Sequence, residues 1–179
     1  MKEEILRKVI RTIPDYPKSG IQFRDLTTVF KDPQYFQSLI QDIAAPLSIL
    51  NLVKIAANEA RGFIIGSAEA AQLGLGFVPI RKAGKLPWQT IACDYQLEYG
   101  ASRLEMHIDA IEPGERVAVI DDLVATGGSV GAAINLIQRI GGQVVACSFV
   151  IELQSQEGHE YIKSLYQDPI QWHSLYKFP

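Results

Sequence analysis

The residue types best suited to chemistry gather in one short stretch of the second half of the chain. Asp121 and Asp122 follow the apolar run Val117–Ile120, and the small or hydroxylated residues Ala125-Thr126-Gly127-Gly128-Ser129 come soon after. Backbone N–H groups in such a turn, at the start of a helix, can bind a phosphate. Carboxylates repel a phosphate, so Asp121 and Asp122 should face hydroxyls, a metal ion or a cationic transition state. A ligand with both a phosphate and a hydroxylated ring would satisfy both halves.

Two common phosphate-binding motifs do not describe this stretch. A P-loop needs a lysine after its last glycine, and Ser129 stands there. A dinucleotide fingerprint needs a third glycine at fixed spacing, which is absent. A strand-to-helix turn with nothing bound is the alternative. The four apolar residues and two acids directly before the turn favour a ligand site.

The elements that position these residues alternate between strand and helix. Apolar runs predict strands at Leu52 to Ala57, Gly76 to Ile80, Val117 to Ile120 and Val144 to Leu153. Helices are predicted at Phe63 to Leu73 and from Val130 to Ile140, and Glu59-Ala60-Arg61-Gly62 reads as a loop. This alternation of strands and helices predicts an α/β fold with a mostly parallel central sheet and helices on both faces.

The remaining segments complete a single expected domain over residues 1–179. Helices are predicted near residues 3–11 and after Asp32-Pro33, separated by a long irregular loop at residues 13–25. Segments Thr90 to Tyr95 and Arg103 to Ile108 could pair as a hairpin or flap. The tail is expected to hold a short helix and an edge strand around Trp172.

Composition excludes several classes of protein. Apolar residues make up 47% and charged residues 21% of the chain, and the net charge of −3 gives no support to nucleic-acid binding. No apolar run reaches membrane-spanning length, and the N-terminus lacks the apolar core of a signal peptide. Two widely spaced cysteines indicate a reducing, cytoplasmic location without a disulfide framework. The three histidines lack metal-ligand spacing, so no structural zinc is expected.

Three basic residues follow predicted strands and could bind an anion. In open α/β sheets the ligand site lies beyond the carboxyl ends of the strands. Arg61 follows one strand, and Arg81 and Lys85 follow the next. We expect all three to surround an anionic group near Ala125 to Ser129. A solvated surface cation is the alternative for each of them.

The acidic pair and the turn that follows resemble the phosphoribosyl-pyrophosphate motif of type I phosphoribosyltransferases. Further segments resemble the adenine phosphoribosyltransferase family in order and spacing. These segments are Phe23-Arg24-Asp25, Glu59-Ala60-Arg61-Gly62-Phe63, Gly76 to Pro87 and Leu97-Glu98-Tyr99-Gly100. The resemblance implies a type I phosphoribosyltransferase-like core, a small N-terminal hood segment and a flexible β flap.

The same resemblance implies a reaction. A phosphoribosyl group would pass from 5-phosphoribosyl 1-pyrophosphate to adenine, giving AMP and pyrophosphate in purine salvage. Mg²⁺ would be held mainly by the sugar diphosphate, with no direct protein ligand, and the protein would be a homodimer that binds neither nucleic acid nor membrane. Two alternatives stay open: a transferase for hypoxanthine, guanine or xanthine, and a non-catalytic regulator that senses the sugar diphosphate.

Roles for the phosphate side follow from the resemblance. Ala125-Thr126-Gly127-Gly128-Ser129 would hold the 5′-phosphate, and Asp121 and Asp122 would face the ribose hydroxyls and the developing positive charge. Arg61, Arg81 and Lys85 would hold pyrophosphate. Glu59-Ala60 would form the loop beneath it, a loop that often contains a cis peptide bond in this family. We expect Asp122 to be a solvent-facing loop carboxylate.

Roles on the base side also follow from the resemblance. Gln22-Phe23-Arg24 would contact adenine, largely through backbone groups, and Leu123 would pack on the ring. Glu98 would handle the proton at the purine imidazole, and Tyr99 would help to close the site. The expected catalytic residues are thus Glu98, Asp121, Asp122 and Arg61.

The chain departs from the family pattern at a few positions. Trp88 is a large aromatic residue at the edge of the expected lid, and Ser129 replaces a threonine but keeps the hydroxyl. Ala57 replaces a common glycine, and Glu69 introduces a charge into a helix that is usually apolar there. The last two departures bear on the packing around the pyrophosphate loop.

Overall fold

A computed structural model describes residues 3–97, 100–166 and 169–178 of the chain, and these fall into two compact units, residues 1–42 and 43–179. The first unit holds the helix α1 (Glu3–Val9), the strands β1 (Arg11–Pro14) and β2 (Gln22–Asp25), and the short helix α2 (Thr27–Phe30). The helix α3 (Pro33–Leu47) starts in the first unit and ends in the second, one residue after Pro46.

The first unit corrects one expectation. Residues 13–25 are not a long irregular loop, because β1 and β2 pair as an antiparallel ribbon with Ile13 opposite Phe23. Pro14 ends β1, and Pro17 and Gly20 lie in the turn between the strands. There, Gly20 adopts a φ of +87° and its N–H donates to Asp15 Oδ1 at 2.6 Å. Such a short ribbon leaves little periodicity for a sequence reading to detect.

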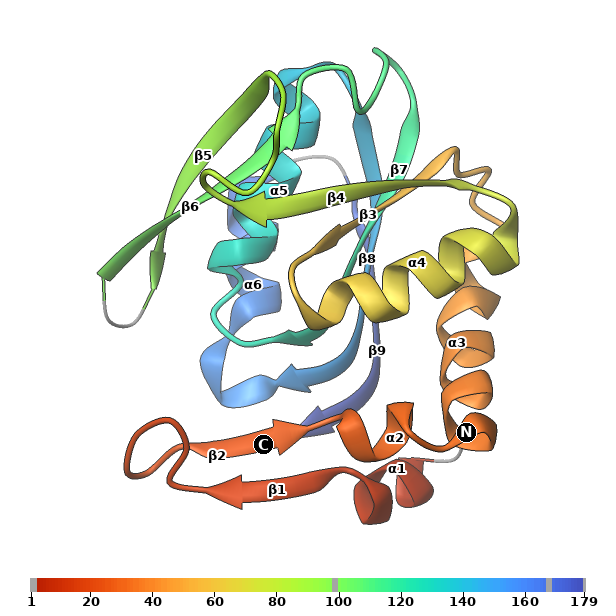
Figure 1. Cartoon of the computed structure of the whole chain (residues 1–179), viewed down its shortest axis with the longest axis vertical. Coiled ribbons are helices and arrows are strands. Elements are labelled where there is room, and N and C mark those ends of the chain that lie inside the picture. The colour runs from red at the N-terminus through yellow and green to blue at the C-terminus, as the bar shows by residue number, and fades with distance from the viewer. Residues whose placement is uncertain (1–2, 98–99, 167–168, 179) are drawn as a thin grey trace. The chain divides into compact units, whose positions relative to one another are not determined.

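The second unit is built on a seven-stranded sheet with the order β5-β6-β4-β3-β7-β8-β9 (Figure 1). Its strands are β3 (Lys54–Asn58), β4 (Gly76–Lys82), β5 (Thr90–Leu97), β6 (Gly100–His107), β7 (Arg116–Val124), β8 (Gln143–Leu153) and β9 (Gln171–Phe178). The five strands from β4 to β9 in the sheet order are parallel, while β6 and β5 continue the sheet antiparallel. The mostly parallel sheet, the hairpin and the edge strand around Trp172 are therefore confirmed.

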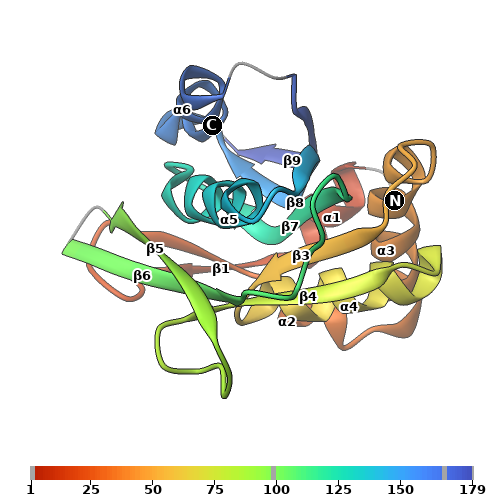
Figure 2. The ribbon, with the colours of Figure 1, turned by 90° about the horizontal axis from the view of Figure 1, so that it is seen from above.

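Helices cover both faces of this sheet, as the alternating sequence predicted. The helix α4 (Arg61–Leu73) lies on one face, and α5 (Gly128–Arg139) and α6 (Gly158–Leu165) lie on the other (Figure 2). Side chains of β3 alternate between the faces: Ile55 and Ala57 contact α4 at Gly66, whereas Ala56 belongs to the core cluster beneath α5. A short 3-10 helix, η1 (Gln154–Gln156), precedes α6.

Close packing between α4 and β3 explains why small residues are needed there. A Cβ atom added at Gly66 would lie 2.8 Å from the Cβ of Ala57. The alanine at position 57, a departure from the family pattern, is thus accommodated because its partner on the helix is a glycine. A larger residue at either position would push α4 off the sheet.

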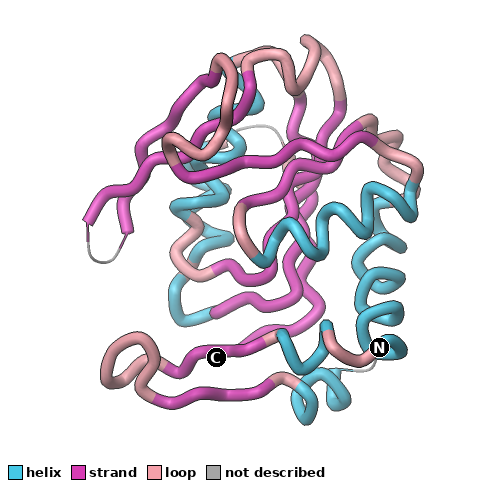
Figure 3. Tube along the Cα trace, in the orientation of Figure 1, coloured by secondary structure: helices cyan, strands magenta, loops and turns pink. Residues whose placement is uncertain are grey.

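The loops after β3 and β7 lie at the same edge of the sheet (Figure 3). This arrangement follows from parallel pairing, because Ala57 is opposite Ile120 and both strands run in the same direction.

Within the described residues, no helix combines the length and the apolar character needed to cross a membrane.

A glutamate is enclosed in α4. Glu69 is 0% exposed, and neither carboxylate oxygen has a hydrogen-bond partner among the described residues. Burial raises the pKa of Glu69 from its ordinary value of 4.5 to about 9. The folded protein therefore keeps this carboxyl protonated at neutral pH, whereas the unfolded chain ionises it.

We predict that Glu69→Gln removes a pH dependence of stability. Between pH 4.5 and about 9 the unfolded chain releases the Glu69 proton and the folded protein retains it. This carboxyl therefore lowers the free energy of unfolding by up to about 1.4 kcal/mol for each pH unit of increase in that window. Urea unfolding at pH 5 and pH 8 should show Glu69→Gln gaining stability relative to the wild type as the pH rises.

The control is Glu160→Gln, which changes a largely exposed glutamate of α6. Its unfolding free energy should follow that of the wild type at both pH values. Parallel curves for Glu69→Gln and the wild type would show that Glu69 is ionised in the folded protein.

Candidate active site

A cavity of about 280 Å³ lies where the ends of β3 and β7 meet. Six of the site residues expected from the sequence line it together: Glu59, Ala60, Arg61, Asp121, Asp122 and Ser129. Four further lining residues were not predicted from the sequence: Asn58, Lys82, Tyr95 and Leu104. The position of Asn58 at the end of a strand next to Glu59 was the one signal that could have identified it.

The two acids occupy different environments although they are neighbours. Asp121 is 8% exposed, and its Oδ1 accepts the backbone N–H of Asp122 at 2.9 Å, while its Oδ2 accepts the side-chain N–H of Asn58 at 3.0 Å. Burial, and then the charge of Asp122, raise the pKa of Asp121 well above its ordinary value, while the hydrogen bond from Asn58 acts to lower it. The two hydrogen bonds fix the orientation of the buried Asp121 carboxyl group.

Asp122 corrects an expectation from the sequence. It is not a solvent-facing loop carboxylate but a 7% exposed residue within β7, paired with Arg61 at 2.7 Å between Nε and Oδ2. The apolar signal ends at Ile120, yet β7 continues to pair with β8 as far as Val124. Backbone pairing rather than side-chain hydrophobicity thus sets the end of this strand.

Arg61 reaches Asp122 because α4 starts earlier than predicted. The helix begins at Arg61 instead of Phe63, directly after a cis peptide bond between Glu59 and Ala60. That cis bond agrees with the family pattern that the sequence resembles. Gly62 allows the first turn of the helix to approach β7, since a Cβ atom there would lie 2.9 Å from Asp121 Oδ1.

A second ion pair holds the loop after β4. Arg81 donates from Nε to Glu59 Oε2 at 2.7 Å, and the backbone N–H of Lys82 donates to Glu59 Oε1 at 3.1 Å. Burial acts to raise the pKa of Glu59, but the bonds from Arg81 and Lys82 outweigh it and lower the pKa. Arg81 also donates from Nη1 to the backbone oxygen of Lys85 at 2.9 Å, so its guanidinium organises both loops.

Arg81 and Lys85 do not line the cavity. Lys82 takes the place on the wall that the sequence interpretation gave to those two residues. Consecutive side chains of a strand point to opposite sides, and Arg81 and Lys82 are the last two residues of β4. Arg61 therefore lines the cavity as expected. Arg81 lies one position before Lys82 in β4, and Lys85 lies in the loop that follows, so neither lines the wall.

The glycine turn opens α5 as the sequence predicted. Gly127 adopts a φ of +81° before the first turn of the helix, and its carbonyl accepts the N–H of Gly131 at 2.8 Å. A Cβ atom at Gly127 would lie 2.9 Å from the backbone oxygen of Gly158, and one at Gly128 would lie 2.7 Å from that of Gln96. The start of α6 and the strand β5 therefore enclose this turn closely.

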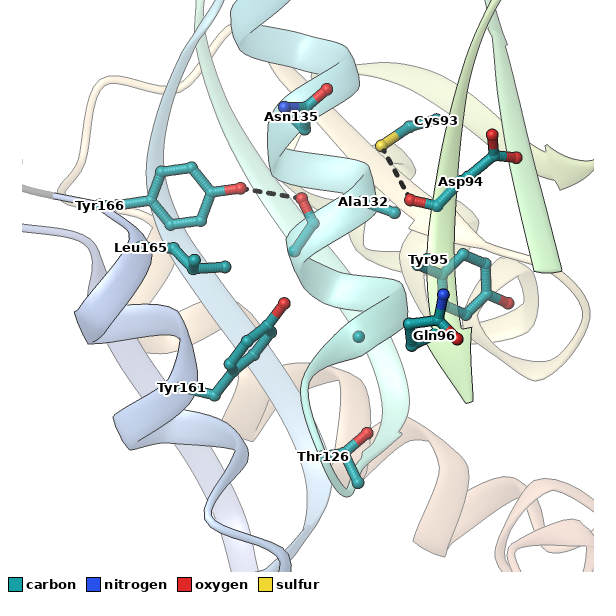
Figure 4. Close-up of a pocket in the computed structure, with 12 residues that line it drawn as sticks. Cys93, Asp94, Tyr95, Gln96, Thr126, Ala132, Asn135, Tyr161, Leu165 and Tyr166 are labelled. Atoms are coloured by element: carbon teal, nitrogen blue, oxygen red, sulfur yellow. Dashed lines mark hydrogen bonds between the residues drawn. The ribbon is translucent and has the colours of Figure 1, made fainter. Parts of the chain in front are cut away.

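A larger groove, of about 690 Å³, lies on the other side of the turn (Figure 4). It runs along α5, with Tyr95 and Gln96 of β5 on one wall and Tyr161 and Tyr166 on the opposite wall. The Tyr166 hydroxyl donates to the backbone oxygen of Gly131 at 2.9 Å. Thr126 and Gly128 belong to this groove, whereas Ser129 faces the cavity with the acids.

The remaining expected site residues are placed elsewhere or not described. Leu123 is a half-buried residue of β7 opposite Ile151 and does not line the cavity. Gln22-Phe23-Arg24 forms most of β2 in the first unit. Glu98 and Tyr99 lie outside the described residues.

Comparison with known proteins assigns this arrangement to a family. Residues 35–177 match a family described as phosphoribosyl transferase domain. A protein named adenine phosphoribosyltransferase from Dinoroseobacter shibae is 52% identical over 160 residues, covering 89% of each chain. The chain belongs to the adenine phosphoribosyltransferase family. A second family member, from Nitrosospira multiformis, is 54% identical over 148 residues and covers 83% of this chain and 85% of its own.

Solved structures of the adenine phosphoribosyltransferase family share the fold. The crystal structure from Thermoanaerobacter pseudethanolicus matches with a TM-score of 0.93 at 44% identity, covering 99% of this chain and all of its own. The Saccharomyces cerevisiae enzyme, crystallised with adenine and an imino-altritol bisphosphate, matches with a TM-score of 0.87 at 33% identity and 97% coverage of both chains. The α/β fold class with a type I phosphoribosyltransferase core is therefore confirmed.

We predict that Gly128→Ala destabilises the protein. The added methyl group would lie 2.7 Å from a backbone oxygen of β5, so the strand or the turn must move. Overpacking of this kind costs about 1–3 kcal/mol, which lowers the thermal midpoint by several degrees. Thermal unfolding followed by circular dichroism measures the change.

Gly131→Ala is the matched control, because it lies one turn further along α5 and its new Cβ would meet only side-chain atoms at 3.4 Å or more. Its thermal midpoint should equal or exceed that of the wild type, since alanine favours a helix over glycine. Equal midpoints for Gly128→Ala and Gly131→Ala would contradict the close approach of β5 to the turn.

Proposed function

We propose that the protein transfers the phosphoribosyl group of 5-phosphoribosyl 1-pyrophosphate to adenine, forming AMP and pyrophosphate in purine salvage. The observation that carries this proposal is the convergence of the Asp121-Asp122 pair, Arg61 and the helix-opening turn on one edge of the sheet. Family membership supports the proposal, and so does the crystal structure of the yeast relative, which was determined in complex with adenine.

Charge stabilisation explains the acids and the turn. When pyrophosphate leaves the anomeric carbon, the sugar gains oxocarbenium character, and carboxylates beside it lower the energy of that state. Asp121 and Asp122 take this role and face the ribose hydroxyls. The backbone N–H groups and hydroxyls of Ala125-Thr126-Gly127-Gly128-Ser129 bind the 5′-phosphate at the start of α5.

Cationic groups hold the leaving pyrophosphate. Arg61 is the central group, since its Nε is fixed by Asp122 and its side chain lines the cavity. Lys82 joins it on the cavity wall, and Glu59-Ala60 forms the loop beneath. Arg81, near the end of β4, and Lys85, in the loop after it, also contribute, and Arg81 is held by Glu59. A guanidinium fixed by a carboxylate loses less entropy when it binds phosphate oxygens.

The base side of the reaction uses other segments. We assign adenine recognition to the backbone of Gln22-Phe23-Arg24 and packing on the ring to Leu123. Glu98 handles the proton at the purine imidazole, and Tyr99 helps to close the site. Both belong to the segment between β5 and β6, and a carboxylate carried by such a hairpin is desolvated when it closes over substrate.

The donor set fits magnesium that arrives with its substrate. Both oxygens of Asp121 accept hydrogen bonds and Oδ2 of Asp122 forms an ion pair with Arg61, so these carboxylates already bind other groups. The oxygens of the sugar diphosphate would therefore hold Mg²⁺. When bound, the ion would neutralise charge on the leaving pyrophosphate.

We further propose that the two units act as one phosphoribosyltransferase domain over residues 1–179, and that the protein works as a cytoplasmic homodimer on small molecules. The family match over residues 35–177 spans both units and supports the single domain. The modest negative charge of −3 supports small-molecule substrates over nucleic acid.

A purine panel tests the function. Purified protein is mixed with phosphoribosyl pyrophosphate, Mg²⁺ and each of adenine, hypoxanthine, guanine and xanthine, and nucleotides are separated by chromatography. AMP should form fastest. Formation of another nucleotide without AMP would overturn the base assignment. Ligand-dependent binding to DNA with no nucleotide product would favour a regulator.

We predict that Asp122→Asn lowers kcat on the order of 10²-fold, because the charge that opposes the developing cation is lost. The substitution also removes the charge partner of Arg61, so the thermal midpoint should fall by a few degrees. Steady-state kinetics and thermal unfolding measure the two effects. An unchanged kcat in a folded variant would remove Asp122 from the proposed role.

Glu98→Gln should reduce kcat for adenine transfer while leaving the affinity for phosphoribosyl pyrophosphate nearly intact. The amide keeps the size of the side chain but cannot exchange a proton with the purine. Initial rates and equilibrium binding of the sugar diphosphate separate the two effects. Equal losses in both measurements would exclude the acid-base role.

A further inference from the structure

Asn58 donates a side-chain hydrogen bond to Asp121 from the neighbouring strand β3. It is the last residue of β3, 3% exposed, and its Nδ2 donates to Asp121 Oδ2 at 3.0 Å across the parallel pair β3–β7. The other oxygen of Asp121 is held by the backbone N–H of Asp122. The orientation of the Asp121 carboxylate is therefore fixed on one side by the chain itself and on the other by Asn58.

The amide at position 58 is an unfavourable choice for stability alone. Its Oδ1 is buried and has no hydrogen-bond partner among the described residues, and a buried unsatisfied acceptor destabilises the folded state. An apolar residue of similar size would avoid this cost. The benefit of the amide is thus its N–H group, which points to an acceptor-only carboxylate.

We propose that Asn58 is a positioning residue for the transfer reaction, holding the Asp121 carboxylate in one orientation and in its charged form beneath the reacting sugar. The role rests on the proposed function, because Asp121 has a cation to stabilise only if phosphoribosyl transfer occurs. A hydrogen bond to the charged form favours that form, and here it opposes both burial and the neighbouring charge of Asp122.

The other charged groups around Asp121 do not replace this bond. The titratable residues that line the same cavity are Asp122 on β7, Glu59 after β3, Arg61 on α4, Lys82 on β4 and Tyr95 on β5. Arg61 is paired with Asp122, and Glu59 is paired with Arg81. On β8 the residue opposite Asp121 is Phe149, which does not titrate.

Two substitutions test the proposal. Asn58→Leu removes the N–H donor together with the orphaned oxygen, and Asn58→Asp keeps the shape but places a second carboxyl group against Asp121 Oδ2. The Asp121 carboxyl is titrated by ¹³C NMR in protein labelled at aspartate, with Asp121→Asn used to assign the resonance. This titration requires no turnover, so its result is independent of the proposed function.

The midpoint for Asp121 should rise by about one pH unit in Asn58→Leu and further in Asn58→Asp, where two carboxyls share a proton. If the purine panel confirms AMP formation, the acid limb of kcat/KM for phosphoribosyl pyrophosphate should shift by the same amount. At pH values below both midpoints, the rate of Asn58→Leu should then be about tenfold lower than that of the wild type.

Ser148→Ala is the matched control, because Ser148 is a fully buried residue of β8 that lies opposite Ile120, and its hydroxyl has no partner among the described residues. It should change neither the Asp121 titration nor the acid limb. Wild-type titration and pH profiles in folded Asn58→Leu or Asn58→Asp would overturn the proposal. If the Asp121 titration shifts but the protein makes no AMP, the contact between Asn58 and Asp121 is supported and the proposed transfer to adenine is refuted.

Discussion

The parallel pairing of β3 with β7 is the constraint on which the site depends. Because Ala57 is opposite Ile120, the residues that follow these two strands reach the same edge of the sheet, although more than sixty positions separate Asn58 from Asp121 in the chain. The small residues at the α4 contact keep that helix close enough for Arg61 to reach Asp122. The cavity that holds the acids and Arg61 therefore follows from strand order and from the small residues at the α4 contact.

Three charged groups in or beside the cavity are each oriented by a partner. Arg61 is oriented by Asp122, Arg81 by Glu59, and Asp121 by Asn58. Such pairing lets a site keep cations and carboxylates within a few ångströms of each other without free buried charge. Glu69 shows the contrasting case, in which an acid without a partner is held neutral by burial.

The sequence predicted the fold class and much of the site because both depend on local signals. Apolar runs and helical spacing identified the main strands and helices, and the acids, the glycine turn and Arg61 stood at their ends. Three features were not predicted from the sequence, because they depend on how strands pair and pack in the folded protein. The ribbon of β1 and β2 is too short to show periodicity, and the continuation of β7 through Asp122 is set by pairing with β8. Lys82 rather than Arg81 lines the cavity wall because side chains alternate along β4.

The two arginine–carboxylate pairs also affect how the site attracts its substrate from a distance. Each pair joins opposite charges within 2.7 Å, so beyond a few ångströms it acts as a dipole whose field declines more steeply than that of a free cation. On a protein of net charge −3, these arginines therefore contribute little long-range steering of an anionic sugar diphosphate. The attraction of Arg61, which lines the cavity, operates once the ligand has entered it, because solvent ions screen the charge weakly there.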